Sequence, residues 1–94
     1  MPTIFSLKQN YPNPFNPSTK IEYELPKETF VTINIFDLKG ANIMSLVNSI
    51  QSAGYKEISW NGLNSSGSQL PAGLYFLTIQ TEEYFNSKKM ILLQ

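Results

Sequence analysis

Alternation of apolar and polar side chains with a period of two residues is the feature that most constrains the fold of this chain. Along residues 19–25, Ile21, Tyr23 and Leu25 alternate with polar or charged residues, as in a strand with one buried and one solvent-exposed face. Pro26 ends the run, because proline has no N–H to donate to a neighbouring strand. No segment shows a convincing helical stripe.

Similar runs, separated by turn residues, recur along the 94 residues. They predict an all-β fold without significant helix, namely a seven-stranded antiparallel β-sandwich. The expected strands are Phe5–Gln9, Thr19–Leu25, Thr29–Phe36, Asn42–Val47, Tyr55–Trp60, Gly73–Thr81 and Phe85–Leu93. A chain of this length forms one domain, which we place at residues 5–94, with residues 1–4 as the remnant of a linker.

Details of four segments are less sharply defined by the pattern. Phe30 lies opposite the apolar side of its strand, so we expect both faces of that strand to be partly covered. In the fifth strand Ile58 and Trp60 make the better apolar pair, although the alternation alone leaves the core-facing side open. Residues 48–54 are expected to form a polar loop. Residues 61–72 are expected to form a long connection in place of a tight turn at Asn61-Gly62.

Residues 10–20 read NYPNPFNPSTK and contain three prolines and three asparagines. Proline fixes φ and disfavours the helical region for the residue before it. The segment is therefore predicted to be a rigid, extended connector that is neither helix nor central strand. Tyr11 and Phe15 would have no use in a flexible linker, so we expect them to pin the connector to an edge of the sandwich.

The composition excludes several kinds of chemistry. The chain has no His and no Cys, which removes Ser-His-Asp and Cys-His nucleophiles as well as zinc and most transition-metal sites. Seven Lys balance seven acidic residues, and there is no Arg, which argues against a nucleic-acid partner. No apolar run is long enough for a membrane helix, and no signal peptide is visible.

The acidic residues offer little for catalysis. Glu22 and Glu24 share a strand face, but it is the wet one, and a catalytic carboxyl needs a sheltered site to raise its pKa. Asp37 could join Asn42 or Asn61 around a calcium ion, but an Asp that caps a turn is the favoured interpretation. We expect no enzyme activity and no cofactor.

The connector and five later blocks together carry a family resemblance. The blocks are Ile35–Gly40 (IFDLKG), Ala53-Gly54, Trp60–Gly62 (WNG), Leu70–Phe76 (LPAGLYF) and Lys88–Leu93 (KKMILL). In this order they resemble the C-terminal sorting domain, type A, of the type IX (Por) secretion system of Bacteroidetes-like bacteria. That family is related to the immunoglobulin-like module of flagellar hook-capping proteins. This sequence departs from the common pattern of that family at two positions: Asn61 stands where Asp is usual, and Gln94 stands where a basic residue is frequent.

The resemblance implies a function and partners. The domain would be a non-catalytic signal that directs an N-terminal cargo through the periplasm to the cell surface or beyond. The type IX outer-membrane translocon and its shuttle would read it, and a separate sortase would cut before about Phe5. The fold would be immunoglobulin-like, with no transmembrane segment and no nucleic-acid partner.

The resemblance also implies roles for particular residues. The last strand would be offered to the machinery by strand pairing or by docking in a groove. The residues implied in recognition are Gly73, Tyr75, Lys88, Lys89, Ile91 and Leu93. Those implied in maintaining the structure are Pro12, Asn13, Pro14, Phe15, Asn16, Pro17, Gly40, Trp60 and Gly62.

A carbohydrate-binding or purely structural accessory module of a secreted polysaccharide-active enzyme is the alternative. Carbohydrate-binding modules present coplanar aromatic rings on a sheet face. Tyr55, Tyr75 and Tyr84 are the candidates for such a platform, although packing in the core is the more common use of aromatic residues.

Overall fold

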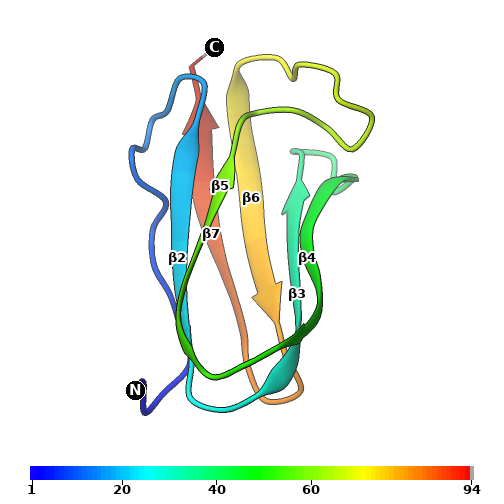
Figure 1. The fold of residues 1–94 in the computed structure, drawn as a ribbon. Coiled ribbons are helices and arrows are strands. Elements are labelled where there is room, and N and C mark those ends of the chain that lie inside the picture. Colours follow the sequence, from blue (N-terminus) through cyan, green and yellow to red (C-terminus); the bar gives the residue numbers. More distant parts are fainter. Residues whose placement is uncertain (94) are drawn as a thin grey trace.

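The computed structural model describes residues 1–93, which form two antiparallel sheets packed face to face (Figure 1). The strands are β1 (Ser6–Leu7), β2 (Thr19–Leu25), β3 (Thr29–Phe36), β4 (Asn42–Gln51), β5 (Gly54–Trp60), β6 (Gly73–Gln80) and β7 (Phe85–Leu92). One sheet has the order β1-β2-β5 and the other β4-β3-β6-β7. The expected seven-stranded, all-β, immunoglobulin-like sandwich is confirmed, and the described residues contain no helix that could cross a membrane.

The core lies between the two sheets and follows the alternation of the sequence. In β2 the buried apolar residues are Ile21, Tyr23 and Leu25. The remaining strands add the other inward-facing side chains, Val31, Ile33, Ile35, Val47, Trp60, Tyr75, Leu77, Ile79, Met90 and Leu92. Burial of these apolar surfaces is the main stabilising contribution in a chain without disulfides.

The structure shows which side chains of β3 and β5 face the core. In β5 Ile58 is half-buried and Trp60 is buried, whereas Tyr55 is exposed. The apolar pair therefore faces the core. On the outer face of β3 Phe30 is exposed, whereas Thr32, Asn34 and Phe36 are half-buried, so that face is partly covered except at Phe30.

Two strands differ from their expected bounds by more than one residue. Strand β4 continues to Gln51 and leaves only two residues before β5. The expectation of a polar loop is wrong for residues 48–51, because these residues pair with Thr29–Thr32 of β3, and ladder hydrogen bonds do not require apolar side chains. Strand β1 has only two residues, although the Lys8 N–H still donates to Glu22 O at 3.0 Å.

Residues 61–72 form the expected long connection. It folds back on itself through a bridge between Leu63 and Gln69, and the Ser65 N–H donates to Ile43 O at the edge of β4. In Figure 1 this loop lies at the same end of the sandwich as the end of β7, while the start of the chain lies at the opposite end.

Candidate functional site

The proline-rich connector is tied to the three-stranded sheet by a buried polar network. Asn10 Nδ2 donates to Thr19 Oγ1 at 2.9 Å and to Pro12 O at 3.1 Å, and both Asn10 and Thr19 are 1% exposed. Tyr11 and Lys20 exchange two backbone hydrogen bonds, each of 2.9 Å. The network satisfies these buried polar groups and fixes the path of the connector along β2.

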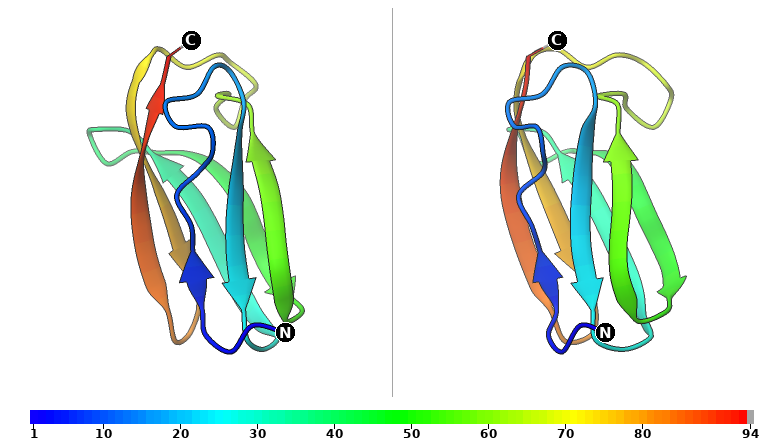
Figure 2. Two further views of the ribbon diagram at one scale, coloured as in Figure 1. Left: turned by 90° about the vertical axis from the view of Figure 1, so that its left-hand side faces the viewer. Right: turned by 60° about the vertical axis from the view of Figure 1, so that its left-hand side comes forward.

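The same connector covers the outer edge of β7. Gln9 Nε2 donates to Lys89 O at 2.7 Å, and the Ile91 N–H donates to Asn13 Oδ1 at 2.9 Å. The Phe15 N–H donates to Ile91 O at 2.9 Å, and the Leu93 N–H donates to Phe15 O at 2.8 Å. We call residues 9–15 the strap. Figure 2 shows this segment rising between β7 and β2, where it closes one side of the sandwich.

An aromatic cluster anchors the strap to the core. Phe15 is 1% exposed and its ring centroid lies 5.5 Å from that of Trp60. Trp60 also meets Tyr75 edge to face at 5.9 Å, and its Nε1 donates to Leu63 O at 3.0 Å. The three rings join the connector, β5 and β6. Tyr11, by contrast, is 79% exposed, so the expectation that both connector aromatics pack on the edge is wrong for Tyr11.

Glycine is needed at two positions, one in the loop after β5 and one in the turn after β3. Gly62 has a φ of +77°, and a Cβ there would lie 3.4 Å from Pro17 O and 3.5 Å from the side chain of Leu92. Gly40 has a φ of +84° and closes the turn in which the Asp37 carboxylate accepts from the N–H groups of Lys39 and Ala41. Asp37 thus caps its own turn.

Three of the recognition residues expected from the resemblance lie on one surface, and the others do not. The side chains of Lys89, Ile91 and Leu93 point away from the core. Gly73 pairs with Leu92, whereas Tyr75 is buried and its hydroxyl donates to Pro71 O at 2.6 Å. Burial, and secondarily the Asp37 carboxylate, raises the pKa of Tyr75. Lys88 alternates with the exposed residues of β7 and is half-buried.

The neighbouring strand β6 contributes two apolar side chains to this surface. Leu74 pairs with Ile91 and Phe76 pairs with Lys89 in the antiparallel ladder, and both are half-buried on the outer face. We call Leu74, Phe76, Lys89, Ile91 and Leu93 the outer ladder face. It combines four apolar side chains with one ammonium group.

Charged residues are distributed unevenly between the two sheets. Strands β3, β4 and β6 carry no ionisable Asp, Glu, Lys or Arg, and β7 carries only Lys88 and Lys89. The shorter strands β2 and β5 carry five charged residues, which are Lys20, Glu22, Glu24, Lys56 and Glu57. The strands of the four-stranded sheet therefore present only one charged group on their outer face, the Lys89 ammonium on β7.

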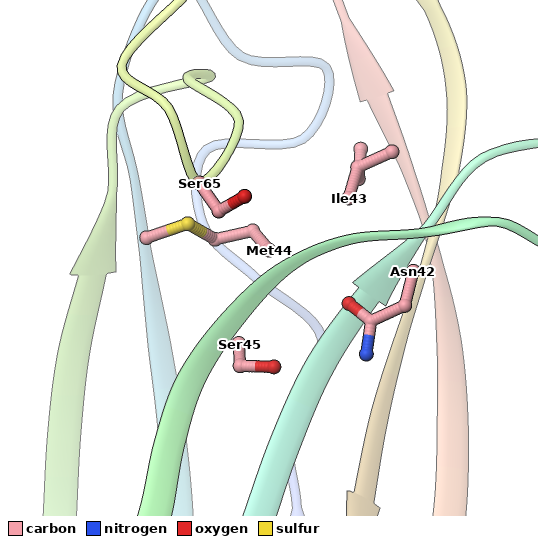
Figure 3. Close-up of a pocket in the computed structure, with 5 residues that line it drawn as sticks. All are labelled: Asn42, Ile43, Met44, Ser45 and Ser65. Atoms are coloured by element: carbon pink, nitrogen blue, oxygen red, sulfur yellow. The ribbon is translucent and has the colours of Figure 1, made fainter.

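The other features offer no sheltered acid or nucleophile. Glu22 lies directly opposite Glu57 on the solvent-exposed face of β2 and β5. The hollow in Figure 3, beside the edge of β4, is lined by uncharged residues only, Asn42, Ile43, Met44, Ser45 and Ser65. Within residues 1–93 no three His, Cys, Asp or Glu side chains group closely enough to hold a metal ion.

The three tyrosines expected as a glycan platform do not form one. Tyr55 is 69% exposed, but Tyr75 is buried in the aromatic cluster. Tyr84 is half-buried and stacks on Phe5 with a centroid distance of 5.4 Å. These positions do not favour the carbohydrate-binding alternative.

Comparison with known families decides the assignment. The family model of the secretion system C-terminal sorting domain matches residues 9–93. The chain belongs to this family. It is therefore a sorting signal of type IX secretion, and the protein that carries it is exported to the cell surface or the extracellular space.

Solved structures share the fold of this sorting domain. The chain is similar to part of PorZ, a surface component of the type IX secretion system of Porphyromonas gingivalis, with 17% identity and a TM-score of 0.64 over 96% of the chain. It is similar to part of dimeric latent PorU from the same organism, with 20% identity and a TM-score of 0.70 over 98% of the chain. It spans only 11% and 9% of those two chains.

A third structure supports the relation to hook-capping proteins. FlgD from P. aeruginosa is 28% identical with a TM-score of 0.61, over 80% of this chain and 59% of that one. No curated protein sequence matches the sorting domain.

Sequence reasoning missed several residues that build the site. Gln9, Asn10 and Thr19 hold the strap, and Thr19 could have been found because it shares the parity of the buried residues in β2. Leu74 and Phe76 could likewise have been noticed, because they are apolar but alternate with the buried Tyr75 and Leu77. The expectation for Gln94 lies outside the described residues.

Proposed function

We propose that this sorting domain is a non-catalytic address whose outer ladder face is read by the type IX translocon and its shuttle. The observation that carries the proposal is the position of Lys89, Ile91 and Leu93, which the family resemblance implicates in recognition, together on one exposed surface of β7. An exposed apolar patch next to a charge is typical of a protein interaction site.

The proposal includes the route and the fate of the domain. The cargo, attached before about Phe5, crosses the periplasm with the domain folded behind it, and a separate sortase removes the domain at the surface. The domain contributes no chemistry to this cleavage. In support, the sequence has no His or Cys, the side chains of Glu22 and Glu57 are exposed, and the carboxylate of Glu24 is paired with Lys8.

A secretion assay with a matched pair of variants tests this function. A fluorescent reporter with a signal peptide is fused to the domain in a type IX-competent host. Ile91→Glu places a charge on the outer ladder face, and Ile50→Glu places the same charge on β4, the opposite edge strand. Ile91 is 42% exposed and Ile50 is 65% exposed, so both variants should fold.

The expected result is that the wild-type and Ile50→Glu fusions reach the surface and the Ile91→Glu fusion is retained in the periplasm. Thermal unfolding of the purified fusions shows that the variants are folded. Equal secretion of all three fusions would exclude the outer ladder face as the recognised surface. Periplasmic retention of the wild-type fusion would contradict the sorting role in that host.

A further inference from the structure

The edge of β7 is closed to a new strand over its C-terminal half. In an antiparallel ladder, alternate residues of an edge strand point both N–H and C=O outward, which in β7 are the odd-numbered residues. The strap occupies Lys89 O, Ile91 N, Ile91 O and Leu93 N. Farther along, the Ser87 N–H donates to Asn86 Oδ1 at 2.8 Å.

Opening this edge would break the four hydrogen bonds and would also disturb the core. The strap cannot leave β7 without moving Phe15, which is 1% exposed against Trp60. Its other end is held by the buried Asn10–Thr19 pair. A partner that added a strand to β7 would have to break the Asn10–Thr19 network and withdraw the Phe15 ring from the core. Proteins commonly cover an edge strand in this way to prevent it from pairing with other chains.

The adjacent outer ladder face is open without any rearrangement. Leu74 and Phe76 belong to β6, an interior strand; Phe76 lies where β6 pairs with both β3 and β7, and Leu74 lies just beyond the end of β3 and pairs with β7. Their side chains meet Ile91 and Lys89 across the ladder. Lys89 is the only charge that points outward from the described strands of this sheet, and Asp37 and Lys39 of the turn after β3, which carry opposite charges, line a hollow beside Leu74. A complementary surface therefore needs a carboxylate opposite Lys89, next to an apolar area.

We propose that the type IX receptor docks face-on onto the outer ladder face, with apolar side chains against Leu74, Phe76 and Ile91 and a carboxylate against Lys89, and that it does not add a strand to β7. This inference rests on the proposed function and specifies its geometry. The strap then acts as a fixed support that keeps β7 in register with β6 during recognition.

A substitution on β6 distinguishes the two modes, because strand addition at the β7 edge involves backbone groups of β7 and no side chain of β6. In the reporter assay described above, Leu74→Gln should lower the amount of reporter at the surface about tenfold, the effect of losing roughly 1.4 kcal/mol of binding free energy. Leu74→Thr, which introduces a β-branched side chain suited to a strand, should act in the same direction if Leu74→Gln folds poorly. Thr78→Gln, on the same face of β6 but opposite Ser87, is the matched control and should be secreted normally.

The double variant Gln9→Ala, Asn13→Ala tests the strap. It removes two of the side-chain hydrogen bonds to β7, so strand addition would become easier and secretion would rise. Face-on docking predicts unchanged or lower secretion. Higher secretion of this variant, or normal secretion of folded Leu74→Gln and Leu74→Thr, would overturn the inference. If Ile91→Glu is retained while both Leu74 variants are secreted, the proposed function stands and only the docking mode fails.

Discussion

Asn34 places an amide in the middle of β3, an interior strand of the four-stranded sheet. Its Oδ1 is buried and has no hydrogen-bond partner among the described residues. Removing an unsatisfied buried acceptor relieves a desolvation cost, and valine suits a strand better than asparagine. We expect Asn34→Val to raise the free energy of unfolding by about 1 kcal/mol, measured by urea denaturation. Asn34→Asp should lower it, because the carboxylate would be partly desolvated; a less stable Asn34→Val would contradict this account.

The two aromatic residues of the connector provide a matched comparison. Phe15 is 1% exposed and Tyr11 is 79% exposed, four positions apart on one segment. Phe15→Ala should lower the free energy of unfolding by about 3 kcal/mol because it leaves a cavity beside Trp60. Tyr11→Ala should change it by less than about 0.5 kcal/mol. Similar losses in the two variants, measured by denaturant titration, would mean that Phe15 does not anchor the connector.

At the scale of elements, the strap and β7 behave as one unit. Asn13→Ala removes the acceptor of the Ile91 N–H, so this amide should exchange with solvent faster while the backbone bond from Leu93 to Phe15 remains. The Met90 amide points toward β6 and serves as the internal control. Hydrogen exchange followed by NMR measures both amides. An unchanged Ile91 rate would show that Asn13 does not protect the edge.

The elements also show what the sequence could predict. Alternation located β2, β3, β6 and β7 because a one-residue shift would turn each apolar set outward. It failed for residues 48–51 of β4, whose polar side chains hide a strand held by backbone pairing with β3. The prolines of residues 10–20 predict an extended connector, but the position of the strap on β7 depends on hydrogen bonds over sequence separations such as the 80 residues between Gln9 and Lys89. No local pattern encodes such a contact.

For the molecule as a whole, two tyrosines at the interface of the sheets make stability depend on alkaline pH. Burial raises the pKa of Tyr23 and of Tyr75 above their usual values, and Tyr23 also donates to Gln51 of the opposite sheet at 2.5 Å. The unfolded chain therefore loses these protons first. The free energy of unfolding should fall as pH rises above about 10.

The double variant Tyr23→Phe, Tyr75→Phe should start from a lower stability at pH 7 and show a shallower fall between pH 9 and about 11. Thermal unfolding across this range measures both. The difference in slope is the relevant quantity, because lysines titrate in the same range in both proteins. Equal slopes would mean that the two phenols ionise alike in the folded and unfolded states.

The strap runs parallel to β7, and the start of the chain and the end of β7 lie at opposite poles of a body 36 Å long (Figure 1). A mechanical pull between these poles slides the two segments along one another, so the bonds at Lys89, Ile91 and Leu93 bear the load together and do not open one at a time. Under the proposed recognition through β7, a cargo that pulls from the start of the chain would load these hydrogen bonds together in shear.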